Sequence, residues 1–198
     1  MAAQFLLYIS AATDMEEERE ILARSVIAVP ADVTWRIELS PRRNDPVDGQ
    51  AIAQADLHLL LLGGDIRAPV GLEWMTTQHL GRLPLPFLKS GVNRTMAAEE
   101  FRRFVELRAN WLPFASHADL QRQALQALGG RLLERAADFG LTPGEIEGLL
   151  RWQNELHQAP EPAEGDVLGG AGESSMIFSR ERYEPSTGIL LEPGDKPA

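Results

Sequence analysis

Apolar residues in the first part of the chain come in short runs separated by segments of mixed polarity. Two runs, residues 5–9 and 57–62, are continuous and predict strands that are buried on both faces of a sheet. Residues 34–39 alternate between apolar and polar positions, which predicts a strand at the sheet edge. Residues 83–88 and 111–115 predict two more strands, although two prolines weaken the former by removing backbone donors.

Helical spacing of apolar positions, together with capping signals, predicts helices between and after these strands. The predicted helices span residues 15–29, 50–55, 72–80, 96–108 and 116–139, with a last one from residue 143 onward. Asp14 is a candidate N-cap for the first helix, and Thr142 and Glu145 form a capping box for the last. The pair Gly129-Gly130 predicts a kink or a break in the helix around it.

Strands that alternate with helices predict an α/β fold with a parallel sheet and helices on both faces. About five strands favour the three-layer flavodoxin-like arrangement, with strand order 2-1-3-4-5 and a ligand crevice between the first and third strands. The expected organisation is an α/β domain at residues 1–115, a helical extension packed on it at 116–158, and a flexible acidic tail at 159–198. Gly and Pro are frequent in that tail. It contains two short apolar segments, one of which is Ile189-Leu190-Leu191. The alternatives for these segments are docking on a partner, docking on the domain, or no role in a loose tail.

Composition narrows the function further. The 198 residues carry a formal net charge of −10, which argues against sequence-independent binding to nucleic acid. There is no cysteine, so disulfides, thiolate metal sites and a cysteine nucleophile are excluded. No stretch approaches the length of a membrane span, and the N-terminus lacks a signal-peptide pattern, so we expect a soluble, cytoplasmic protein.

Several familiar catalytic patterns are missing. The sequence has no Walker A motif, no G-x-S-x-G elbow and no G-x-G-x-x-G after a predicted strand. The four histidines are scattered without the spacing of metal ligands, so we expect no metal or resident cofactor. His58 begins a predicted strand, where a structural role is more common than a catalytic one.

The order of the remaining motifs resembles a family of TIR-like domains, named after the Toll/interleukin-1 receptor fold. The turn at Ser10 followed by Asp14-Met15-Glu16-Glu17-Glu18-Arg19 resembles one family signature. The strand at 55–64 followed by a loop and Glu73 resembles a second, and residues 84–89 resemble the next strand. The similarity covers roughly residues 4–108. It departs from the family in a shorter first turn and in Asp65-Ile66-Arg67-Ala68, which replaces an aromatic-glycine pair.

This resemblance implies a nucleotide-directed domain in a bacterial defence or signalling system, with NAD or a related nucleotide as substrate or ligand. Related TIR and nucleoside deoxyribosyltransferase domains cleave N-glycosidic bonds with a glutamate on the helix after this strand, and Glu73 is the matching residue. A carboxylate there stabilises or attacks the positively charged sugar of the transition state. The implied ligand-binding residues are Ser10, Thr13, Arg43, Gly63, Gly64, Asp65, Arg67 and Trp74.

Each of these residues also has a simpler interpretation, such as a favourable charge at a helix start for Glu73 or packing for Trp74. Three functions therefore remain open: an NAD nucleosidase, a non-catalytic TIR-like module that self-associates or binds nucleotide, and a deoxyribosyltransferase. The expected partners are a nucleotide and either further copies of the chain or a partner NTPase or defence component. The catalytic options depend on Glu73 projecting into an open crevice shared with the turn after the first strand.

Overall fold

The computed structural model describes residues 4–41, 45–158 and 189–191. Its centre is a six-stranded sheet in the order β5-β4-β3-β1-β2-β6. The strands are β1 (Gln4–Ala11), β2 (Thr34–Leu39), β3 (Leu57–Leu62), β4 (Leu85–Lys89), β5 (Leu112–Phe114) and β6 (Ile189–Leu191). The first five strands are parallel and β6 pairs antiparallel with β2, so the predicted α/β fold and the order 2-1-3-4-5 are confirmed.

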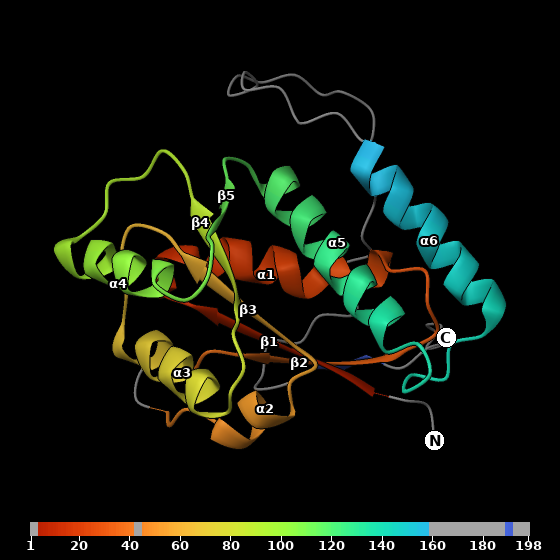
Figure 1. Ribbon diagram of the computed structural model, residues 1–198. Helices are drawn as coiled ribbons and strands as arrows, with labels where there is room; N and C mark the ends of the chain where they lie inside the picture. The colour runs from red at the N-terminus through yellow and green to blue at the C-terminus, as the bar shows by residue number, and fades with distance from the viewer. Residues whose placement is uncertain (1–3, 42–44, 159–188, 192–198) are drawn as a thin grey trace, which may run out of the picture.

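Helices cover both faces of this sheet (Figure 1). One layer contains α1 (Glu16–Ser25) and α5 (His117–Glu134), with α6 (Pro143–Gln158) packed on α5. The other layer contains α2 (Gly49–Gln54), α3 (Ala68–His79) and α4 (Met96–Glu106). Short 3₁₀ turns at Thr13–Met15 and Val26–Ala28 flank α1. No helix in the described ranges combines the length and the apolar character that crossing a membrane requires.

Alternation along β1 divides the core into two parts. Phe5, Leu7 and Ile9 face α1 and α5, where they join the largest group of buried apolar side chains. The intervening residues face α2 and α3, and there Leu6 packs with residues of α2. Because neighbouring side chains of a strand point to opposite faces, the polar side chains of Tyr8 and Ser10 are both brought to the α3 side. This alternation is what positions the candidate site.

Several sequence predictions about these elements differ from the structure. The strand β2 was predicted at the edge of the sheet, but Ile189–Leu191 pairs with its outer side, so this apolar segment of the tail joins the domain. The rest of the predicted tail lies outside the described residues. The helix predicted from residue 72 begins at Ala68, because a proline suits the first turn of a helix and Pro69 is in that position.

Another difference is the predicted break, since α5 continues through Gly129-Gly130 as one helix. A Cβ atom added at Gly129 would lie 2.0 Å from Nε2 of Gln153 and 3.0 Å from the ring of Trp152, both on α6. Gly129 therefore permits the close approach of two helices and does not break one. The capping box at the start of α6 is confirmed, with Thr142 and Glu145 bonded to each other.

Candidate functional site

Glu73 lies in the second turn of α3, one turn further into the helix than the sequence indicated. This position removes the interpretation of Glu73 as a charge at the helix start, because that effect fades within the first turn. The side chain points towards the sheet and has 0% exposure. A fully buried carboxyl group needs hydrogen-bond partners to offset the loss of water.

Two hydroxyl groups hold the carboxyl group of Glu73. The phenol of Tyr8, in β1, donates to Oε1 at 2.8 Å, and the hydroxyl of Ser40, just after β2, donates to Oε2 at 2.7 Å. Ser40 Oγ in turn accepts a hydrogen bond from the backbone N–H of Ala11 at 3.0 Å. The carboxyl group therefore joins β1, the end of β2 and α3 at a single point.

A second set of contacts continues from Glu73 through His58 in β3. The Nε2 atom of His58 lies 2.7 Å from Ser10 Oγ, and its Nδ1 atom lies 2.9 Å from Thr77 Oγ1. Thr77 donates its only hydroxyl proton to the backbone oxygen of Glu73 at 2.8 Å. All three contacts are satisfied when Nδ1 of His58 carries the proton and Ser10 donates to Nε2. We call these six residues, Tyr8, Ser10, Ser40, His58, Glu73 and Thr77, the Glu73 cluster.

Burial determines the protonation of the Glu73 cluster. Burial lowers the pKa of His58 to about 3, so the imidazole is neutral at physiological pH. Burial also raises the pKa of Tyr8 far above its ordinary value, with a further contribution from the neighbouring Glu73, so the phenol stays a donor. The pKa of Glu73 is raised by burial too, although the hydroxyls of Ser40 and Tyr8 that donate to it and the charge of Arg19 oppose the rise.

The two loops of the predicted ligand crevice are in direct contact. Asp14 Oδ2 accepts hydrogen bonds from the backbone N–H groups of Gly64 at 2.8 Å and Asp65 at 3.1 Å. Asp14 is therefore not the predicted N-cap, since the cap position of α1 is Met15. A Cβ atom added at Gly63 would lie 2.5 Å from Sδ of Met15 and 2.6 Å from Oδ2 of Asp14. Gly63 thus leaves room for the side chains of Met15 and Asp14 directly against the second loop.

These contacts hold the two loops together at the carboxyl ends of β1 and β3. The backbone amides of Gly63 and Gly64 were expected to hold phosphate or ribose oxygens, but the amide of Gly64, like that of Asp65, donates to the carboxylate of Asp14. The carboxyl group of Glu73 is enclosed between α3 and the sheet. The expectation that Glu73 projects into an open crevice is therefore wrong for this structure. The physical reason is that groups of the chain itself bind these atoms. The carboxylate of Asp14 accepts from the loop amides, and the hydroxyls of Tyr8 and Ser40 donate to Glu73.

The other predicted ligand-binding residues are not gathered at one point. Thr13 is exposed in the turn before α1, and Arg67 is exposed at the cap position of α3. Asp65 turns towards α4, where its Oδ1 accepts a hydrogen bond from Thr95 at 3.0 Å. Trp74 is fully buried and its ring meets Phe101 edge to face at 6.3 Å, so it packs α3 against α4. The remaining candidate, Arg43, lies outside the described residues.

Four members of the Glu73 cluster were not predicted as site residues: Tyr8, Ser40, His58 and Thr77. A signal for two of them exists in the sequence, because Tyr8 lies two positions before Ser10 in an apolar strand and therefore shares its face. His58 is polar in another buried strand, and the register pairs it with Tyr8. Ser40 and Thr77 come from a loop and a helix interior, and neither gives a comparable signal.

Replacing Gly63 by alanine tests whether the contact between the two loops is built into the fold. The added methyl group has to displace Met15 or Asp14, and overpacking of this kind costs about 1–3 kcal/mol. The matched control is Gly71→Ala in α3, where an added Cβ meets nothing within 4 Å, and it should stabilise the fold by up to about 1 kcal/mol. Urea unfolding of both variants measures the difference; equal stability of the two would contradict the close contact at Gly63.

The raised pKa of Glu73 predicts a dependence of stability on pH. Above the ordinary carboxyl pKa the unfolded chain releases this proton more readily than the folded chain does, so stability falls as pH rises. As pH rises above the ordinary carboxyl pKa and towards the raised pKa of Glu73, the wild type should lose stability relative to Glu73→Gln, by about 1.4 kcal/mol for each unit separating the two pKa values. Denaturant unfolding at several pH values measures this loss. The exposed Glu147→Gln variant should follow the wild type, and parallel curves for wild type and Glu73→Gln would refute the assignment.

Comparison with known proteins adds nothing to this geometry. No family model matches the chain, and no curated protein or solved structure matches it either. The fold places the Glu73 cluster on the α3 side of the sheet and brings the two crevice loops into contact. Any function assigned to this region is therefore inferred from these contacts and from the surface of the surrounding helices.

Proposed function

We propose that the chain is a TIR-like interaction module that self-associates through the outer side of α3 and has no nucleotide turnover. The observation that carries the proposal is the uncharged outer side of this helix. Leu72, Met75 and Leu80 are 54%, 50% and 45% exposed, and they recur at the spacing of one helix face together with Thr76 and His79. We call these five residues the α3 face.

The α3 face differs from the rest of the surface in its charge. Charged residues make up 24% of the chain, yet the only Asp, Glu, Lys or Arg within α3 is Glu73, which is buried. The neighbouring α4, by contrast, carries a network of ion pairs on its surface, centred on Arg102 and Glu99. Exposed apolar groups that lie together on an otherwise charged surface mark interaction sites.

A second copy of the chain is the partner that suits this face best. In a two-fold symmetric dimer the same patch meets itself, so a patch that contains charges of one sign would repel its copy. The α3 face contains no Asp, Glu, Lys or Arg. Contacts within the chain support the same proposal, because the amide of Gly64 is already bonded to Asp14 and the carboxyl group of Glu73 to Tyr8 and Ser40.

Sedimentation velocity over a concentration series tests self-association. The average mass of the wild type should rise with concentration. Leu72→Glu should weaken the association at least tenfold, because each copy then brings a negative charge to the shared patch. The matched control is Leu150→Glu, which changes an equally half-exposed leucine on α6. A wild type that stays monomeric at high concentration, or a control that is as impaired as Leu72→Glu, would contradict the proposal.

An NAD nucleosidase is the second candidate, and one observation favours it. Glu73 lies beside Ser10 and Ser40, near the carboxyl ends of β1 and β2, which is the side of a parallel sheet where ligands bind. This function requires α3 to move away from the sheet, so that the carboxyl group of Glu73 can contact the sugar of the substrate. Deoxyribosyl transfer would require the same opening.

An assay for nicotinamide release from NAD separates the two candidates. With the wild type at a concentration that promotes association, we expect no release above that of a buffer blank, because Glu73 has no access to the substrate. Glu73→Gln should give the same result. Release that is present in the wild type and lost in Glu73→Gln would replace the module with a nucleosidase, and the Glu147→Gln control should then retain it.

A further inference from the structure

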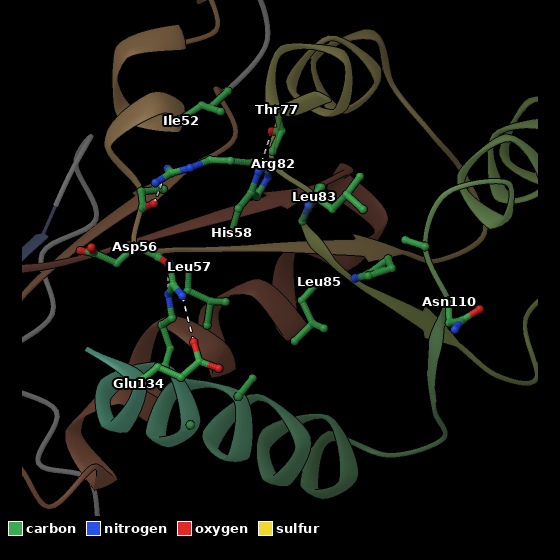
Figure 2. A pocket seen from close by; sticks show the side chains of 17 residues that line it. Ile52, Asp56, Leu57, His58, Thr77, Arg82, Leu83, Leu85, Asn110 and Glu134 are labelled. Carbon is green, nitrogen blue, oxygen red and sulfur yellow. Dashed lines mark hydrogen bonds and ion pairs between the residues drawn. The ribbon is translucent and has the colours of Figure 1, made fainter. Parts of the chain in front are cut away.

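An open cavity of about 640 Å³ lies at the amino ends of the parallel strands, whereas the predicted crevice is at their carboxyl ends. It crosses the amino ends of β3 and β4, between α5 on one side and α2 and α3 on the other (Figure 2). Its volume falls in the range of small-molecule sites, which is about 300–1,000 Å³. None of the residues predicted from the sequence as ligand contacts lines it.

Small residues on α5 make room for this cavity. Ala127 and Gly130 lie one turn apart on the side of α5 that lines it. A Cβ atom added at Gly130 meets nothing within 4 Å, whereas Gly129 is explained by its contact with α6. A glycine inside a helix costs stability relative to alanine, and no packing contact accounts for the one at position 130. We interpret Gly130 as leaving space for the cavity in front of α5.

The walls of the cavity are apolar and its floor is polar. Leu57, Leu83 and Leu85 contribute apolar walls, and Figure 2 shows these side chains around the opening. His58 and Thr77, bonded to each other at 2.9 Å and almost fully buried, lie at its inner end. The cavity therefore reaches the Glu73 cluster from the side opposite to the crevice. An apolar site with a few convergent polar groups is the usual form of a small-molecule site.

The charges at the rim leave one cation without a carboxylate. Asp56 Oδ1 pairs with Arg135 and its Oδ2 accepts the backbone N–H of Leu6 at 2.8 Å, while Glu134 pairs with Arg131 at 2.9 Å. Arg82 bonds only to the backbone oxygens of residues 53 and 55, through Nη1. Arg135 pairs with both Asp56 and Asp138, whereas within the described ranges no carboxylate pairs with Arg82, so the guanidinium of Arg82 is available to an anion.

We propose that this cavity binds a small apolar molecule that carries a single carboxylate. The apolar body packs against the leucine walls and in front of Gly130, and the carboxylate accepts hydrogen bonds from the guanidinium of Arg82. A guanidinium binds a carboxylate in a well-defined planar geometry, which gives the site its preference for an acid over a neutral molecule. This site does not depend on the function proposed for α3.

Isothermal titration calorimetry with 2-naphthoate tests the site, and the neutral 2-naphthamide is the matched ligand. The wild type should bind the acid and should bind the amide at least tenfold more weakly. Arg82→Gln should remove most of that difference, because it removes the cation. Gly130→Leu should weaken binding of both ligands at least tenfold by filling the cavity, whereas Gly148→Leu on α6, where an added Cβ also meets nothing within 4 Å, should bind like the wild type.

Thermal unfolding without ligand establishes that each variant is folded. If Gly130→Leu fails to fold, Ala127→Leu fills the same space from one turn earlier in α5 and replaces it in the comparison. No binding of 2-naphthoate to the wild type at millimolar concentration would overturn the proposal. So would unchanged binding in the cavity-filling variant, or an amide that binds as tightly as the acid.

Discussion

The enclosed carboxyl group of Glu73 is the interaction on which the α3 side of the structure depends. Its two oxygens are held by hydroxyls from β1 and from the end of β2, so it links three segments that are far apart in the sequence. A buried carboxyl group with one partner removed is costly, because the remaining oxygen then has no donor and no water. This constraint fixes the position of α3 over the sheet and, through Thr77, the orientation of His58.

The carboxyl and amino ends of the parallel strands differ, and the Glu73 cluster lies between them. At the carboxyl ends, Asp14 takes the place that an external anion would occupy. Gly63 there leaves room for contact between the loops that follow β1 and β3. At the amino ends, small residues of α5 leave a cavity that ends at His58 and Thr77. Loop groups are therefore bonded to each other where parallel α/β proteins usually bind ligands, and the cavity lies at the other end.

Much of the architecture could be predicted from local patterns. The bounds of β2 and β3 match the predicted ones, because continuous or alternating apolar runs are local signals that the sheet then uses directly. The capping box of α6 was predicted for the same reason. The predicted start of α3 and the predicted break in α5 were wrong. Pro69 lies in the first turn of α3, and Gly129 serves a contact with α6 that no local pattern of α5 shows.

The sequence by itself determined the parallel α/β fold, the order of its strands and the presence of an acid at position 73 near their carboxyl ends. Only the tertiary structure decided that this acid is enclosed, that Asp14 fills the neighbouring amides, and that Tyr8 and Ser40 are its donors. The physical reason is the range of the interactions. Strand and helix signals arise between residues a few positions apart, whereas the contacts of Glu73 join residues 65 and 33 positions apart and exist only once the layers have packed.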